Sequence, residues 1–127
     1  MAAVIKGVEV SANRLAEVAR LTSHGIMITD ANGHIEWINE AFTRITGYTL
    51  EEVSGQIPGS FLRGPKSDVE SSKRMGEAIR LRQAITAEII NYRKDCTEFM
   101  AHIEITPMWN SNRKIDGFVG VTNDREK

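Results

Sequence analysis

Few side chains of this sequence are suited to acid–base or metal chemistry, and they are widely spaced. The three histidines, His24, His34 and His102, lack the short intervals that are typical of zinc sites, and the single cysteine, Cys96, cannot build a thiolate site. His102 and Glu104 share a strand face, which is an ordinary surface pairing. The sequence also has no nucleophile elbow, phosphate loop or dinucleotide fingerprint. These features predict a module without catalytic residues or a metal site.

One polar residue, Asn91, interrupts an apolar pattern. Residues 85–108 alternate apolar and polar side chains on both sides of a turn at 94–97, which predicts an antiparallel hairpin. Asn91 falls on the face made by Ile85, Ala87 and Ile89, opposite the face of Glu88. A buried amide without a partner costs about 1–3 kcal/mol. Asn91 therefore needs a hydrogen-bond partner, which is either the backbone of a loop or a bound ligand.

The elements that surround this hairpin follow from local signals. We expect a helix at 12–22, strands at 25–30 and 34–38, a helix at 40–46 between Asn39 and Gly47, an irregular connector at 55–65, a helix at 67–82, the hairpin, and a strand at 115–123. Two strands followed by helices and then three strands indicate an α+β fold with one antiparallel sheet. The middle helices would cover one face, and the amphipathic N-terminal helix the other.

The helix at 67–82 has an unusually small expected inner face. That face consists of Val69, Ser72, Met75, Gly76 and Ile79. Small residues that face a sheet leave space, which is filled either by neighbouring side chains or by a ligand.

The overall composition is that of an ordinary globular domain. The chain has 127 residues, with 41% hydrophobic and 26% charged, and 16 basic against 17 acidic side chains. Because the net charge is close to zero, it does not favour binding to nucleic acid or to an anionic membrane. A single cysteine favours a reducing compartment, and no signal peptide or membrane span is recognisable, so we expect a cytoplasmic protein. The length predicts one domain, residues 1–127.

Three motifs together resemble the PAS domains of bacterial signalling proteins. They are N-x-A-F-x-x-x-T-G-Y at 39–48, F-L-x-G-P-x-x-D at 61–68 and N-Y-x-K-D at 91–95. The resemblance extends over about residues 12–125. It implies a PAS fold with a five-stranded antiparallel sheet, a core at about 25–125 and a flanking helix at about 12–22. It also implies a sensory module that is linked to a histidine kinase, a diguanylate cyclase or a chemoreceptor.

Within this family the sequence is similar to the light-oxygen-voltage (LOV) branch, which binds flavin. The motif of that branch, G-x-N-C-R-F-L-Q-G, contains a photoactive cysteine, but here Pro58 or Gly59 stands at its place. The branch holds the flavin ring with two Asn and one Gln, and this sequence has Asn91, Ala101 and Thr122 at the three positions. The flavin implied is FAD ahead of FMN. Haem is disfavoured because residues 67–82 contain no His.

The similarity to the LOV branch, together with the apolar pattern, predicts which residues would contact a ligand. Asn91 would hydrogen-bond to a ligand, with Thr122 as the weaker polar contact, and the remaining contacts would come from Met27, Phe61, Leu62, Ile79, Ile89, Ala101 and Phe118. The alternative is a PAS module without a cofactor that serves only dimerisation and signal relay. In either case we expect a homodimer through the N-terminal helix and the outer sheet face, because Leu15, Val18 and Ala19 form an apolar stripe.

Overall fold

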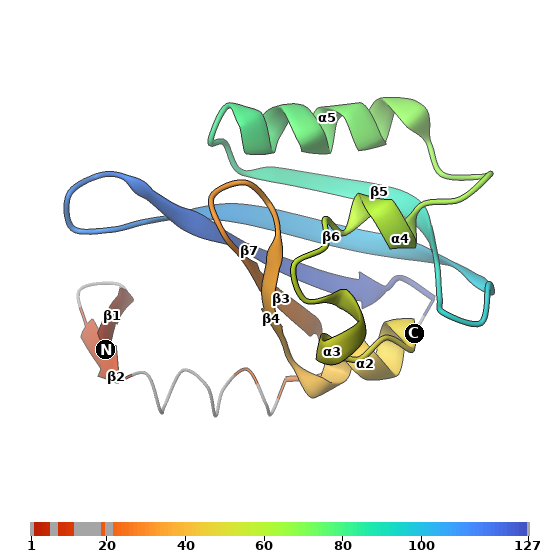
Figure 1. The fold of residues 1–127 in the computed structure, drawn as a ribbon, viewed down its shortest axis with the longest axis horizontal. Coiled ribbons are helices and arrows are strands. Elements are labelled where there is room, and N and C mark those ends of the chain that lie inside the picture. The colour runs from red at the N-terminus through yellow and green to blue at the C-terminus, as the bar shows by residue number, and fades with distance from the viewer. Residues whose placement is uncertain (1, 6–7, 12–18, 20–21, 127) are drawn as a thin grey trace.

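The main body of the protein is a five-stranded antiparallel sheet with helices gathered on one face (Figure 1). The computed structural model describes residues 2–5, 8–11, 19 and 22–126. The sheet order is β4-β3-β7-β6-β5. Its strands are β3 Gly25–Thr29, β4 Ile35–Ile38, β5 Ile85–Tyr92, β6 Glu98–Trp109 and β7 Ile115–Asp124. The helices are α2 Glu40–Thr46, α3 Leu50–Val53, α4 Gly59–Leu62 and α5 Val69–Arg80.

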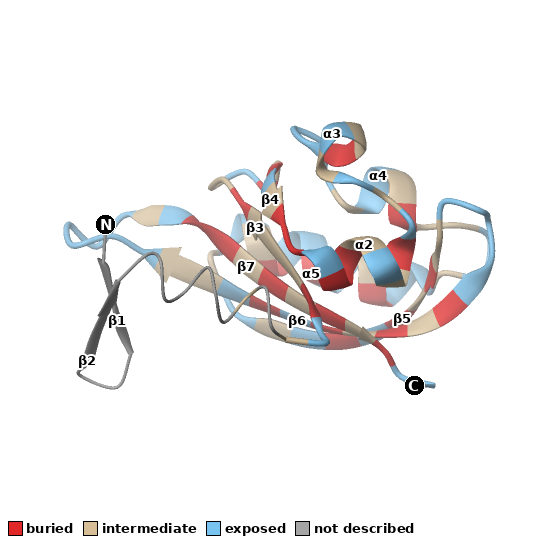
Figure 2. Ribbon diagram, turned by 90° about the horizontal axis from the view of Figure 1, so that it is seen from below, coloured by how far each residue is buried: buried red, intermediate tan, exposed pale blue. Residues whose placement is uncertain are grey.

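The long hairpin of β5 and β6 has the predicted register and burial. Asn91 pairs with Phe99, and Ile89 pairs with Ala101. The predicted inward face is buried apart from Ile85, which is half-buried, and Figure 2 shows the alternation of colours along these strands. Most of the larger core cluster comes from this sheet: Ala87, Ile89, Phe99, Ala101, Ile103, Ile105 and Phe118, together with Met75 of α5. The face toward α2–α5 is therefore the one that builds the core.

Asn39 fixes the start of α2 and connects it with two other segments. Its Oδ1 accepts hydrogen bonds from the backbone N–H of Phe42 at 3.0 Å, as an N-cap, and from that of Ile26 at 2.8 Å. Its Nδ2 donates to the carbonyl oxygens of Ala19 at 2.7 Å and His24 at 3.1 Å. Gly47, at a φ of 83°, ends the helix in the left-handed conformation. The sequence prediction for this helix is confirmed at both ends.

The prediction for α5 is correct in existence but wrong in part of its orientation. Asp68 caps the helix by accepting a hydrogen bond from the Ser71 N–H. The buried row is Ser71, Met75 and Ala78, whereas Val69, which we expected on the inner face, is 64% exposed. Periodicity could not separate these rows, because small residues occupy both sides of the helix. Ser72, Gly76 and Ile79 lie one row further round and border a cavity.

The N-terminal region contains a feature that the sequence did not signal. β1 Ala2–Ile5 and β2 Val8–Ser11 form a separate two-stranded antiparallel sheet. The helix expected at 12–22 lies outside the described residues, except for Ala19, which is helical, and Thr22. In the parts of the chain that are described, no helix has the length and apolar character needed to cross a membrane.

Candidate functional site

A cavity of about 230 Å³ lies between the inner face of the sheet and the helices α2, α4 and α5. It is lined by Met27, Thr29, Gly33, Phe42, Thr46, Ile57, Pro58, Gly59, Leu62, Arg63, Ser72, Met75, Gly76, Ile79, Asn91, Phe99, Ile103, Ile105, Phe118, Gly120 and Thr122. Most of these side chains are apolar. Among them Arg63 is the one ionisable side chain, so it sets the charge of the cavity.

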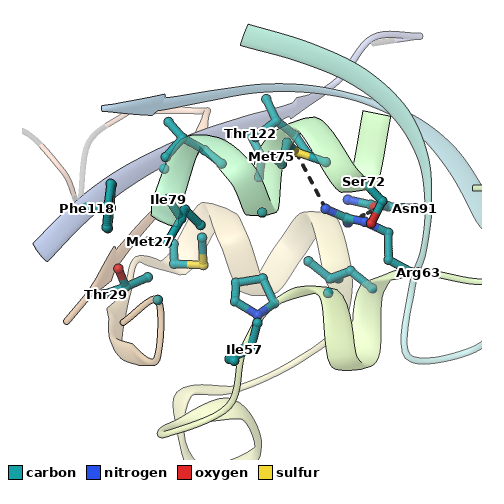
Figure 3. A pocket seen from close by; sticks show the side chains of 18 of the residues that line it. Met27, Thr29, Ile57, Arg63, Ser72, Met75, Ile79, Asn91, Phe118 and Thr122 are labelled. Carbon is teal, nitrogen blue, oxygen red and sulfur yellow. Dashed lines mark hydrogen bonds between the residues drawn. The ribbon is translucent and has the colours of Figure 1, made fainter. Parts of the chain in front are cut away.

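Arg63 reaches the cavity because the chain changes direction directly after α4. It is the C-cap residue of that helix and has an extended backbone, with φ −88° and ψ 152°. Its side chain extends toward β5 and α5, as Figure 3 shows. Nη1 donates a hydrogen bond to Asn91 Oδ1 at 2.5 Å, and Nη2 contacts the thioether sulfur of Met75 at 3.7 Å. Nε is buried and has no hydrogen-bond partner.

The guanidinium of Arg63 has no carboxylate partner within the described part of the chain. It belongs to none of the ion pairs found there, whose basic partners are Arg44, Lys66, Arg80, Arg93, Lys94 and Arg125, nor to the contacts that two histidines make with carboxylates. Burial lowers the pKa of Arg63, because desolvation disfavours the charged form. An arginine starts so far above neutrality that it stays protonated. Within the described residues, the cavity therefore carries one positive charge without a counter-ion.

Asn91 is the partner that Arg63 does have, and this bond gives the buried amide a hydrogen-bond partner within the protein. Asn91 is 1% exposed, and its oxygen accepts from the guanidinium. The partner is thus a side chain from the connector, 28 residues away, and not a loop backbone. Asn91 Nδ2 has no hydrogen bond to another described residue. The hydroxyl of Thr122, on β7, is buried and also lacks a partner.

The structure brings six of the nine expected contact residues to the cavity. These are Met27, Leu62, Ile79, Asn91, Phe118 and Thr122. The other three lie elsewhere: Phe61 packs edge-on against Tyr48 with ring centroids 4.8 Å apart, and Ile89 and Ala101 are buried in the sheet core without lining the cavity. Arg63 was missed, although its position offered a signal, because F-L-R-G replaces the F-L-Q-G of the motif.

The other candidate chemical groups lie outside the cavity. Cys96 is exposed in the turn between β5 and β6, at a φ of 73°. Asp30 Oδ1 accepts hydrogen bonds from the backbone N–H groups of Asn32 and His34, which is a turn role. Across the residues that the structure describes, no group of His, Cys, Asp and Glu is arranged to hold a metal ion.

The residues present do not fit a flavin that is held through three amides. Ala101 offers no polar group, and the oxygen of Asn91 is already bonded to Arg63. The edge of a flavin ring alternates donors and acceptors. The cavity presents donors to it from Arg63 and Asn91 Nδ2, whereas the Thr122 and Ser72 hydroxyls can both donate and accept. The hydroxyls of Thr29 and Thr46, also in the wall, already donate to backbone carbonyls.

Comparison with known proteins assigns the family. The sequence profile of the PAS domain matches residues 23–127, and the chain belongs to this family. A "Blue-light photoreceptor" of Listeria innocua is 34% identical over 113 residues, which is 87% of this chain and 44% of that protein. The "Nitrogen fixation regulatory protein" of Klebsiella oxytoca is 30% identical and covers 80% of this chain and 20% of its own length. The chain spans less than half the length of these curated relatives.

Solved structures agree with this assignment and place the chain among LOV-like PAS domains. The LOV domain from a blue-light activated histidine kinase of Erythrobacter litoralis has a TM-score of 0.75 and 30% identity. The match covers 80% of this chain and 95% of that one. An RNA-binding light-oxygen-voltage receptor has a TM-score of 0.81 at 26% identity, with coverage of 88% and 32%. The five-stranded sheet with its helices is the PAS fold.

Proposed function

We propose that this chain is a non-enzymatic sensory domain whose cavity binds a small ligand and whose fold relays that event to an output domain. The observation that carries the proposal is the apolar cavity that contains a cationic side chain, for which the described part of the chain supplies no counter-ion. Such an arrangement costs folding energy and is found where function needs it. The similarity to light-activated kinases and to a nitrogen fixation regulator supports a sensory role.

Phe42 and Asn39 provide a physical connection from the cavity toward the N-terminus. Phe42 lines the cavity, and its N–H is bonded to Asn39. Asn39 in turn holds the carbonyl of Ala19, which precedes the core. We take the whole of residues 1–127 as one sensory unit, in the cytoplasm, that forms a homodimer through its N-terminal segment and outer sheet face. Its output would be a histidine kinase, a diguanylate cyclase or a chemoreceptor.

Detection of a bound small molecule tests this function directly. Protein purified under native conditions is analysed by native mass spectrometry and by absorption, and then denatured so that released molecules can be identified. We expect one ligand molecule per protein molecule. We expect this ligand to be lost in Ser72→Phe, because Ser72 lines the cavity, where a phenyl ring would occupy the space, and is only half-buried. A protein that carries no ligand, and whose melting temperature responds to no compound of a metabolite library, would contradict the proposal.

Two alternatives have an observation in their favour. Flavin, as FAD ahead of FMN, is favoured by the likeness to blue-light receptors, and flavin absorption bands in the purified protein would reveal it. A relay domain without any ligand is favoured by the cavity size, since 230 Å³ lies below the range of about 300–1,000 Å³ for small-molecule sites. Ligand-independent signalling by a Ser72→Phe protein would support that alternative.

A further inference from the structure

We propose that the ligand of this cavity is a small, mostly apolar carboxylic acid, bound as its carboxylate by Arg63. This assignment rests on the proposed function and adds the chemical class of the ligand. It follows from three properties of the cavity: its charge, the free edge of the guanidinium, and the apolar character of the remaining wall.

The charge of the cavity selects an anion. Arg63 is the one ionisable side chain in its wall, and in the described chain no Asp or Glu pairs with it. The nearest polar groups favour an acceptor, since Asn91 directs its oxygen to Nη1 and offers the Nδ2 amide hydrogens as donors. A cluster of donors with one positive charge is complementary to a carboxylate.

The bonding of the guanidinium leaves one edge for a bidentate partner. Asn91 takes Nη1, whereas Nε has no partner and Nη2 contacts only the Met75 sulfur at 3.7 Å. Nε and Nη2 form one edge of the planar group, and two parallel N–H bonds from such an edge match the two oxygens of a carboxylate. A thioether is a weak acceptor on a flexible side chain. The carboxylate thus replaces the sulfur of Met75, which moves aside.

The rest of the cavity limits what the carboxylate is attached to. Met27, Leu62, Ile79 and Phe118 offer apolar contacts, and the volume of about 230 Å³ admits a short alkyl chain or a single ring system. Inorganic phosphate fits poorly, because a doubly charged group here would meet one cation and an apolar wall. Asn91 is a positioning residue in this scheme, since it orients the guanidinium through Nη1.

Matched pairs of acids and neutral amides test the assignment on the unmodified protein. Calorimetric titration would use phenylacetate and hexanoate, with phenylacetamide, hexanamide and inorganic phosphate as controls. Because charge-assisted hydrogen bonds are lost with the neutral amide, we expect each amide to bind about ten- to a hundred-fold more weakly than its acid. Equal affinities for acid and amide, or no binding of either acid at millimolar concentration, would overturn the proposal.

Variants at Arg63 locate the contact. Arg63→Gln keeps a donor for Asn91 but removes the charge, and we expect it to lose the preference for acid over amide. Arg63→Lys should retain that preference at reduced affinity, and Arg74→Gln, on the exposed side of α5, should behave as the unmodified protein. Unchanged acid binding in Arg63→Gln would refute the assignment. Binding of a flavin, or of any other compound without a carboxylate, in the absence of binding of the acids refutes the carboxylate alone, whereas failure of the proposed function means that no small molecule binds at all.

Discussion

Removing the side-chain amide of the buried Asn39 is expected to destabilise the domain more than the same substitution of an asparagine at the protein surface. Asn39 is 4% exposed and makes four hydrogen bonds. In Asn39→Ala the buried N–H of Phe42 loses its cap, which costs about 1 kcal/mol. The N–H of Ile26 loses its side-chain acceptor and adds about 1–1.5 kcal/mol. The carbonyl of His24 can turn to water, since His24 is exposed, so it adds little.

The expected total for Asn39→Ala is therefore a fall of about 2–3 kcal/mol in the free energy of unfolding. Asn39→Asp retains both accepted hydrogen bonds and loses only the two donated by Nδ2, so we expect a loss of about 0.5–1 kcal/mol, well below that of the alanine variant. Equilibrium urea denaturation measures both values, and Asn112→Ala, at an exposed turn position, serves as the control with a change within about 0.5 kcal/mol. An aspartate variant as unstable as the alanine variant would show that the accepted hydrogen bonds are not the main contribution of Asn39 to stability. An alanine variant within about 1 kcal/mol of the unmodified protein would refute a stabilising role of the Asn39 side chain altogether.

Three further predictions concern the helix α5, the cysteine and the N-terminus. Gly76→Ala should raise the free energy of unfolding by about 0.8–1 kcal/mol in urea denaturation, because Gly76 is in an exposed helix interior and an added Cβ meets no atom within 4 Å; a destabilised variant would contradict this. No cysteinyl photoadduct should form, because Cys96 is exposed in a turn and does not line the cavity; bleaching of a flavin-reconstituted protein by blue light that reverses in the dark and is abolished by Cys96→Ala would overturn this. Deleting residues 1–22 should cause aggregation or a change of oligomeric state, and an unaltered sedimentation profile of a soluble truncated protein would count against it.

The parts of the fold that the sequence predicted are those with local signals. The helix between Asn39 and Gly47 has both of its caps in the sequence, and the β5–β6 hairpin has apolar residues at every second position on both sides of a turn. The orientation of α5 was partly wrong, because Ser71 and Ala78 are no more apolar than their neighbours. The contact between Arg63 and Asn91 joins residues that are 28 apart, on a connector and a strand, and no local pattern encodes such a pair.

A sensor needs a ligand that interacts differently with two states of the protein, because otherwise binding shifts no equilibrium. The arrangement around Arg63 supplies that difference. Without a carboxylate, the Nη2 atom is in contact with Met75, which is buried and belongs to α5 and to the core cluster of the sheet. With a carboxylate on the Nε and Nη2 edge, Met75 must leave its place, and a packed core responds to such a change by repacking and not by gradual deformation. The same bond that neutralises the partly buried charge of Arg63 would therefore move a side chain that belongs to α5 and packs in the core of the sheet, and would link occupancy of the cavity to the conformation of the domain.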